Sequence, residues 1–362
     1  MTASIWLRDV FSYGLQLTLI IATGAALAIA FRLREPRVTL AYWRTLLTAC
    51  LVLPLCQPWL TAETLVAGTT LVLPGEAAAG KAQEVPLTVV TSAPWPLASL
   101  VLMVLATGIA MRLLWLGLGV WTLARLRRTA APFVPLPDAF SRAEERIGVR
   151  AGLYVSERIA GPVTFGLMDP VVIVPPSVVP MGFHVHEAIA YHELLHVRRR
   201  DWLFEVIEEG IRTVFWFHPG IWWLIGRIQL SREQVVDQAA IRLTESKERY
   251  LDALLAVALT KSTTTLVPAP LFLRRNLLKK RVAQILQETT MTTRRLIASL
   301  TVSSAALALA ATVAVRSFPL EAQGTVGFAQ ESGGGPIQIV KGGDHLLHAS
   351  FSEYPRRAIE QQ

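Results

Sequence analysis

The stretch His192-Glu193-Leu194-Leu195-His196 decides how this sequence is interpreted. On an α-helix, residues four positions apart share one face, so His192 and His196 can bind a single metal ion while Glu193 stands beside it. Residues 184–191, just before the motif, contain neither Pro nor Gly, and this favours a continuous helix. The pattern is typical of zinc hydrolases. In the alternative interpretation the two histidines are structural and half-buried, and their nitrogens are hydrogen-bonded to backbone carbonyls.

A catalytic zinc ion usually has three protein ligands and keeps its fourth position for water. The two cysteines, Cys50 and Cys56, lie far upstream in an apolar run and are expected to be membrane-core residues. A helical pattern from about residue 228 to residue 244 places Glu233 and Asp237 on one face. We therefore predict that Glu233 is the third ligand, and that Asp237 accepts a hydrogen bond from the second ring nitrogen of a ligand histidine. The alternative is a solvated acidic face interleaved with basic residues.

With 52% hydrophobic and 17% charged residues, this chain of 362 residues differs from an ordinary soluble protein. Its apolar residues are concentrated in runs, as in membrane helices, which need about 20 such residues to cross the hydrocarbon core. The first run is too long for the apolar part of a signal peptide, so we expect it to be retained. The sequence thus predicts a mainly α, integral membrane protein with about four transmembrane helices. The expected spans are about 11–31, 46–60, 95–118 and 296–315.

Basic residues near the span ends predict the orientation, because such residues are retained on the cytoplasmic side of a membrane. They cluster after the first and third spans and before the fourth: Arg32, Arg34, Arg37 and Arg44; Arg125, Arg127 and Arg128; Arg274, Arg275, Lys279, Lys280, Arg281, Arg294 and Arg295. All three clusters fall on one side if each run crosses once. We therefore expect both termini outside and the segment of about 125–295, which contains the zinc motif, in the cytoplasm.

The same clusters explain the formal net charge of +8, since anionic lipid head groups would meet them. Nucleic-acid binding favours basic residues interleaved with aromatic ones in a soluble module, and we do not find that pattern, so no direct nucleic-acid partner is expected. Arg112 lies inside the third expected span, where an arginine is a functional candidate by default. The favoured interpretation is that it snorkels to the interface or marks the point where the span leaves the lipid.

Between residues 129 and 180 the pattern changes to short β-prone segments separated by Gly and Pro. These segments are residues 152–155, 163–165 and 171–174. We expect them to form a small sheet beside the zinc helix. An edge strand of such a sheet is a candidate for binding the substrate backbone by strand addition.

Residues 202–230 are mostly apolar and include the stretch Phe215-Trp216-Phe217-His218-Pro219. The apolar run around His218 is short and is broken by Pro219. We therefore expect an interfacial or re-entrant helix pair packed on the protease core, not another crossing. His218 is a candidate catalytic residue that would donate a hydrogen bond to the developing oxyanion. The alternative is that its ring makes a structural hydrogen bond.

Several motifs together resemble the BlaR/MecR family of membrane metallopeptidases, the antibiotic-sensing transducers. They are His192-Glu193-x-x-His196 with Arg198 and Asp201 following, Phe215-Trp216-Phe217-His218-Pro219, and Arg232-Glu233-x-x-x-Asp237. The segments Gly161–Gly166 with Val171–Pro175 and Leu278–Val282 extend the resemblance, which covers roughly residues 1–315. The combination is far more specific than any single motif.

The resemblance implies a multi-pass protein of the bacterial cytoplasmic membrane with an α+β, gluzincin-like zinc protease domain between the third and fourth spans. Its ligands to Zn²⁺ would be His192, His196 and Glu233, and Glu193 would be the general base. The implied substrate is the chain itself or a cytoplasmic regulator such as a transcriptional repressor, and self-association into a homo-oligomer stays open. The expected domains are a membrane domain at 1–128, the protease at 129–295, the fourth span at 296–315 and an extracytoplasmic tail at 316–362.

Two features depart from the antibiotic sensors. Val236 stands where family members often have Cys, and only about 46 residues, without an S-x-x-K motif, follow Arg316. We therefore do not expect a β-lactam sensor. Residues 354–360, after the Gly-rich residues 333–336, resemble the opening of a TonB-type C-terminal domain, which indicates either a fragment of a longer protein or an accidental likeness. Two alternatives to a signalling protease stay open: an HtpX-type quality-control protease, and a non-enzymatic transducer or TonB-like coupler with a vestigial zinc site.

Overall fold

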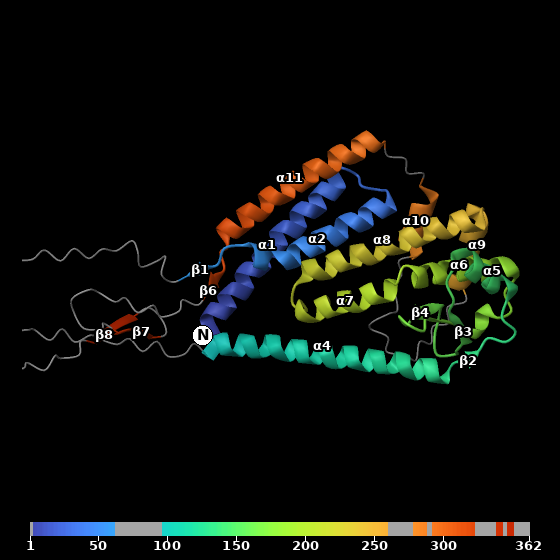
Figure 1. Ribbon diagram of the computed structural model, residues 1–362, viewed down its shortest axis with the longest axis horizontal. Helices are drawn as coiled ribbons and strands as arrows, with labels where there is room; N and C mark the ends of the chain where they lie inside the picture. The colour runs from blue at the N-terminus through green and yellow to red at the C-terminus, as the bar shows by residue number, and fades with distance from the viewer. Residues whose placement is uncertain are drawn as a thin grey trace, which may run out of the picture. The chain divides into compact units, whose positions relative to one another are not determined.

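The computed structural model describes residues 3–61, 96–259, 278–287, 292–322, 338–342 and 346–350, and it is mainly helical (Figure 1). Within these residues, four helices are long and apolar enough to cross a membrane. They are α1 (Ala3–Ala30), α2 (Pro36–Cys56), α4 (Pro96–Thr129) and α11 (Thr293–Ser317). This confirms the prediction of a mainly α protein with four candidate membrane spans.

The ends of these helices differ from the limits of the apolar runs. Helix α2 begins at Pro36, not near residue 46, and ends at Cys56 with Pro54 inside it. A proline fits the first turn of a helix because its missing N–H has no helical partner there. Helix α4 continues past the expected limit at residue 118 to Thr129. In both cases the helix extends beyond its apolar part, since backbone hydrogen bonding continues where the hydrophobic pattern ends.

The three predicted strands are confirmed with the same bounds: β3 (Gly152–Val155), β4 (Val163–Phe165) and β5 (Val171–Val174). With β2 (Ala131–Pro132) they form a sheet in the order β2-β3-β5-β4. Strand β5 is parallel to β3 and antiparallel to β4. All four residues of β5 are buried, as expected for a central strand with a continuous apolar sequence. Strand β4 is at an edge of this sheet.

Seven helical segments complete the part of the chain around the sheet. They are α5 (Asp138–Ile147), the 3₁₀ turn η1 (Pro176–Val178), α6 (Phe183–Arg198), α7 (Asp201–Val214), α8 (Pro219–Thr244), α9 (Lys247–Leu259) and α10 (Leu278–Leu286). Helix α6 is central, because it packs on α5, α8 and α9. Its Leu194 is fully buried in a core that also contains Val172 of β5, Val236 of α8 and Tyr250 of α9. This core holds α6 and α8 together.

The chain divides into two compact units, one of residues 1–17, 53–104 and 311–362, and one of residues 18–52 and 105–310. In the first unit, β1 (Leu60–Thr61) pairs in parallel with β6 (Glu321–Ala322), and β7 (Gln338–Gly342) forms a hairpin with β8 (Leu346–Ser350). All the elements from α5 to α10 belong to the second unit. The domain limits expected at residues 128, 295 and 315 stay predictions. The residues that resemble a TonB-type domain, and the Gly-rich residues before them, lie outside the described residues.

Candidate metal centre

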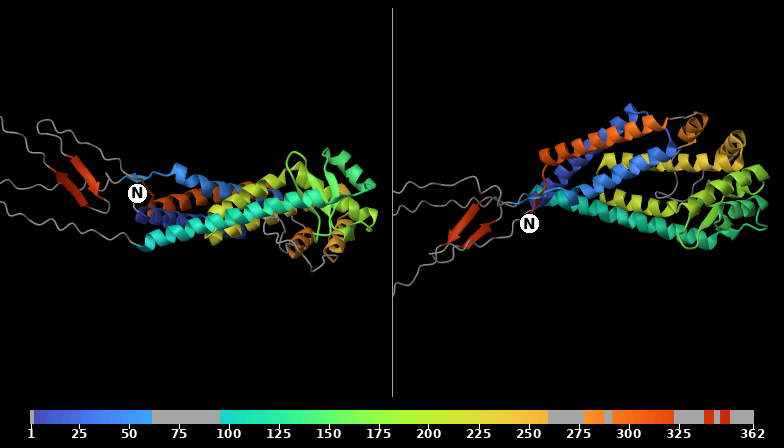
Figure 2. Two further views of the ribbon diagram at one scale, coloured as in Figure 1. Left: turned by 90° about the horizontal axis from the view of Figure 1, so that it is seen from below. Right: turned by 45° about the horizontal axis from the view of Figure 1, so that its top comes forward.

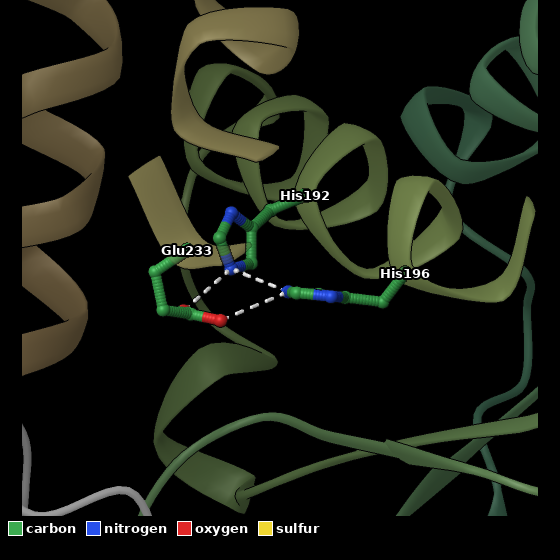
Figure 3. A group of neighbouring side chains, drawn as sticks. All are labelled: His192, His196 and Glu233. Atoms are coloured by element: carbon green, nitrogen blue, oxygen red, sulfur yellow. Dashed lines mark hydrogen bonds and ion pairs between the residues drawn. The ribbon is translucent and has the colours of Figure 1, made fainter. Parts of the chain in front are cut away.

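Helix α6 presents the two motif histidines on one face. It begins after Gly182, whose backbone is extended, and it runs without interruption through Arg198, as the sequence predicts. The Nε2 atoms of His192 and His196 lie 3.3 Å apart. Both side chains are well buried, with 12% and 6% of their surface exposed. Figure 3 shows the two rings turned toward a common point.

Glu233 of α8 completes the group. Its carboxylate oxygens lie 3.6 Å from His192 Nε2 and 3.5 Å from His196 Nε2. In Figure 3 the carboxylate faces both ring nitrogens. Glu233, predicted as the third ligand, thus lies beside both histidines, and its role as a ligand stays a prediction. Glu233 and Asp237 each expose 1% of their surface, so the alternative of a solvated acidic face is wrong.

The separations are compatible with one bound metal ion. With metal–ligand distances of 2.0–2.2 Å, two ligand atoms of a tetrahedral zinc ion lie about 3.3–3.6 Å apart. The 3.3 Å between the two Nε2 atoms agrees with this range, and the distances of 3.6 and 3.5 Å run from the two nitrogens to different oxygens of Glu233. Each of the three residues offers one ligand atom, and these atoms all lie within 4.8 Å of one another. Two imidazoles and one carboxylate are a donor set that suits zinc.

The partner of His196 determines which of its ring nitrogens bears the proton. Its Nδ1 lies 2.9 Å from Asp201 Oδ2. An ionised carboxylate can only accept a hydrogen bond, so Nδ1 donates, and in the neutral ring Nε2 then keeps its lone pair. Burial raises the pKa of Asp201, but the hydrogen bond and charge of His196, with the charges of Arg199 and Arg232, outweigh it and lower the pKa to about 2. Asp201 is therefore ionised at neutral pH.

A tight turn between α6 and α7 brings Asp201 to His196. Arg200 has a left-handed backbone with φ of 53°, which is uncommon for a residue other than glycine. Its N–H donates to Val197 O at 3.0 Å, and α7 begins at the next residue, Asp201. Only Arg199 and Arg200 lie between the two helices. A left-handed arginine next to a ligand histidine is the kind of strained position that is often found at functional sites.

His192 has the same kind of support from α8 and α9. Its Nδ1 lies 3.0 Å from the hydroxyl of Tyr250, which donates its own proton to Asp237 Oδ1 at 2.7 Å. The tyrosine oxygen therefore accepts from Nδ1, and Nε2 of His192 also keeps its lone pair. Burial, followed by the charges of Arg281 and His196, lowers the pKa of His192 to about 3, so the ring is neutral. Asp237 was predicted to accept from a ligand histidine; it lies 3.4 Å from His192 Nδ1 and acts mainly through Tyr250.

Three electron-pair donors thus converge on one point: His192 Nε2, His196 Nε2 and the Glu233 carboxylate. Their lone pairs repel each other at these distances unless a cation lies among them. The alternative in which the histidines are held by backbone carbonyls does not describe these rings, since the other nitrogen of each is held by a side chain. The group can hold a metal ion.

Glu193 stands beside the group and is held by the sheet. Thr164 Oγ1 of strand β4 donates to Glu193 Oε2 at 2.5 Å. Glu193 comes directly after His192 on α6, and β4 packs against that helix. The carboxylate expected to act as the general base is therefore oriented by an edge strand. Thr164 was not predicted as a site residue; the available signals were its place in a strand next to the zinc helix and in the segment Gly161–Gly166 of the resemblance.

Arg281 of α10 is a second residue that the sequence analysis did not assign to the site. Its Nε and Nη2 atoms donate to the two oxygens of Asp237 at 2.8 and 2.5 Å, and its Nη1 lies 3.3 Å from Glu233 Oε2. The side chain is 14% exposed. Only its place among the motifs of the resemblance pointed to it. Tyr250 gave no signal at all, and Asp201 appeared only as part of the resemblance.

The position of His218 corrects one expectation. His218 lies at the start of α8, where Nδ1 accepts from the N–H of Ile221 and Nε2 lies 3.2 Å from Thr18 Oγ1 of α1. Glu233 is the fourteenth residue after Pro219 in the helix, which is about 21 Å at 1.5 Å per residue. His218 therefore cannot donate to an oxyanion at the metal group. Its ring caps helix α8, in line with the structural alternative.

A histidine pair on one helix with a carboxylate from a second helix, in a chain with four candidate membrane spans, defines the class of membrane metallopeptidases. The family model described as BlaR1 peptidase M56 matches residues 13–285 of the chain. The protein belongs to this peptidase family. The match includes α6, α8 and α10 up to residue 285, and with them every residue of the metal group.

Individual relatives are similar over a shorter part of the chain. The regulatory protein BlaR1 of Bacillus licheniformis is 27% identical over 106 residues, which is 29% of this chain and 18% of the relative. The methicillin resistance mecR1 protein of Staphylococcus aureus is 29% identical over 110 residues, or 30% of this chain and 19% of the relative. The similarity thus spans less than a fifth of the length of these relatives.

Proposed function

We propose that this protein is a membrane-embedded zinc metalloendopeptidase that hydrolyses peptide bonds at the His192, His196 and Glu233 group. The observation that supports this most strongly is the convergence of two histidine nitrogens, 3.3 Å apart, and the Glu233 carboxylate, while a side chain holds the second nitrogen of each ring. Membership of a peptidase family supports the reaction class. A vestigial site would need neither the ligand geometry nor the buried groups that orient it.

When bound, Zn²⁺ would polarise the scissile carbonyl and lower the pKa of a water molecule toward 7. Glu193 would take the proton from this water and return it to the leaving amine, and such general acid–base catalysis contributes about 10²- to 10⁴-fold. The hydrogen bond from Thr164 fixes one carboxylate oxygen of Glu193, and the other oxygen would act as the base. Asp201 and Tyr250 keep the two ligand rings in the tautomers that present Nε2.

Strand β4 is the candidate for binding the substrate backbone. It is the last strand in the sheet order, so no further strand of the described residues pairs with its outer edge. An extended peptide added there would lie next to Thr164, which contacts Glu193. This arrangement would bring the scissile bond close to the base.

We further propose that the peptidase site faces the cytoplasm and that the enzyme acts in signal transduction. The basic clusters at the ends of the spans support the orientation. Two relatives have the names of a regulatory protein and a resistance protein, and they support a substrate that is either the chain itself or a cytoplasmic regulator such as a transcriptional repressor. A bacterial cytoplasmic membrane would then be the location, with both termini outside.

The decisive experiment compares detergent-purified wild type with Glu193→Gln. We expect the variant to bind about one zinc ion per chain like the wild type, because Glu193 is not a ligand, and to lose proteolysis by at least about 10²-fold. Mass spectrometry of the chain after incubation would detect self-cleavage. Glu145→Gln on the exposed surface of α5 is the matched control and should retain both properties. Cleavage by Glu193→Gln at the wild-type rate would refute the role of Glu193, and absence of zinc from both proteins would refute the metal site.

A further inference from the structure

The α7–α8 hairpin, which consists of α7, the turn at residues 215–218 and the first part of α8, contacts two candidate membrane spans. We propose that this hairpin is inserted into the membrane without crossing it, and that lipid acyl chains cover its outward apolar face. Figure 1 shows α7 and α8 between α2 and α4, and Figure 2 shows the same helices from two other directions. This inference goes beyond the proposed peptidase and does not depend on the metal.

The tip of the hairpin contacts the middle of α1. His218 Nε2 lies 3.2 Å from Thr18 Oγ1. Gly220 also lies close to α1, because a Cβ atom added to this glycine would be 3.3 Å from Cδ1 of Ile21. Thr18 is midway along the candidate span Trp6–Ala30, about 18 Å from either end at 1.5 Å per residue. If α1 crosses the bilayer, the tip of the hairpin lies near the middle of the hydrocarbon core.

The other side of the hairpin runs antiparallel to α4. Glu209 Oε2 accepts from Arg112 Nη2 at 3.3 Å, and Trp216 Nε1 donates to Leu105 O at 3.2 Å. On the hairpin Trp216 follows Glu209 by seven residues, whereas on α4 Leu105 precedes Arg112 by seven residues. The ring of Trp216 lies directly on Gly108, where any Cβ atom would overlap it. These matched contacts place the hairpin alongside the candidate span Ser99–Thr129.

Charges at this depth are paired. Glu209 binds Arg112 and also Arg212 of α7, and its side chain is 3% exposed. The guanidinium groups of both arginines lie over the ring of Trp222, at 4.8 and 5.4 Å from its centroid. Inside a membrane, ionisable residues are tolerated when they pair with each other and face the protein interior. Arg112, expected to snorkel, instead binds the hairpin.

The hairpin has large apolar side chains that are partly open. They are 37% to 51% exposed: Ile207, Val214, Phe217, Trp222 and Trp223. Large exposed apolar surfaces are typical of sites that meet a membrane or a partner. Helix α7 has 14 residues, about 21 Å in length, and is too short to cross a core of about 30 Å. Helix α4 also exposes large apolar side chains, such as Leu114, so acyl chains that surround α4 would reach the hairpin packed on it.

Insertion of the hairpin also determines where the metal group lies relative to the membrane, and this step rests on the proposed function. Glu233 lies about 21 Å along α8 from the tip, and the end of α1 lies about 18 Å from Thr18. The metal group would then lie close to the membrane surface on the side where α1 ends. Peptide segments that emerge next to the bilayer would reach it most directly.

The experiment measures the depth of single residues in the full chain, reconstituted in vesicles of phosphatidylcholine and phosphatidylglycerol. Cys50 and Cys56 are replaced by serine, and an environment-sensitive fluorophore is attached to Val214→Cys, Phe217→Cys or, as an exposed control in the turn before β5, Met168→Cys. Quenching is measured with aqueous iodide, with a nitroxide next to the lipid head group, and with a nitroxide near the end of the acyl chain. Two hairpin positions are used so that the failure of one variant to fold leaves the other.

We expect the labels at residues 214 and 217 to be quenched most by the deep nitroxide and roughly tenfold less by iodide than the label at residue 168. Equal quenching of residues 217 and 168 by iodide would overturn the proposal. Strongest quenching by the head-group nitroxide would overturn it as well, since the hairpin would then lie in the interface. None of these readouts requires zinc or proteolysis, so the result is independent of the peptidase assignment.

Discussion

Replacing Asp201 by asparagine tests whether the metal group depends on a charged partner behind His196. The substitution keeps the shape and one acceptor oxygen, so Nδ1 of His196 can still donate, but it removes the negative charge that lies 2.9 Å from the ring. It also removes the negative charge that pairs with Arg199 Nε at 3.1 Å. Losing such a carboxylate partner lowers metal affinity about 10- to 100-fold, which corresponds to about 1.4–2.7 kcal/mol.

The assay is competition for zinc between the detergent-purified protein and a chelator of known affinity, at neutral pH and fixed salt. Asp201 is ionised there, because its pKa is held at about 2. The matched control is Asp169→Asn, whose side chain is 82% exposed and faces Arg127 at 3.9 Å. An exposed pair of this kind contributes about 0–1 kcal/mol to stability, and we expect no change in zinc affinity. Both variants should elute as the wild type does in size-exclusion chromatography.

Equal zinc affinity of Asp201→Asn and wild type would refute the reasoning, because the charge of Asp201 would then have no effect on His196 as a ligand. An equal loss in Asp169→Asn would also contradict it, since a remote surface charge would account for the effect. A loss in Asp201→Asn alone supports the chain of contacts from the α6–α7 turn to the metal group.

Three further predictions concern the other groups around the site. Thr164→Val removes the hydrogen bond to Glu193 and should lower kcat about tenfold at unchanged zinc affinity, whereas Thr164→Ser should restore it. Arg281→Gln leaves Asp237 without its bidentate cation and should lower the free energy of unfolding by about 3 kcal/mol in thermal or SDS unfolding, while Lys280→Gln on the exposed side of α10 should not. Burial and nearby charges hold the pKa of His192 at about 3, below its ordinary value of 6.5. Between these pH values the unfolded chain binds more protons than the folded one, so the free energy of unfolding of the metal-free protein should fall by up to about 1.4 kcal/mol per pH unit on acidification. The same dependence of the unfolding free energy on pH in His192→Gln would contradict this.

Local patterns in the sequence were sufficient for the elements that support the site. Residues 152–155, 163–165 and 171–174 were predicted as strands because Gly and Pro residues separate them, and the structure has the same bounds. The helix through the histidine motif was predicted because its residues lack any helix breaker. The ends of α2 and α4 were less predictable, since a membrane helix continues into polar residues where hydrophobicity gives no further signal.

Residues that act on the site from distant parts of the chain could not be predicted in this way. Tyr250 reaches His192 only because α9 packs on α6, and Arg281 reaches Asp237 only because α10 packs on α8. Neither residue has a spacing or a neighbour that indicates these contacts. The catalytic role considered for His218 failed for the same reason, because its distance from Glu233 depends on how far α8 extends toward its N-terminal end.

The sequence by itself determined which chemical groups are available and which of them share a helix face, because helical periodicity depends only on positions a few residues apart. It therefore predicted the histidine pair, the adjacent Glu193 and the acidic pair on α8. Only the tertiary structure decided that Glu233 meets both histidines and that a separate partner holds the second nitrogen of each ring. The packing of α6 against α8 and α9 brings these groups together, and such contacts depend on side chains of the whole core, not on any local pattern.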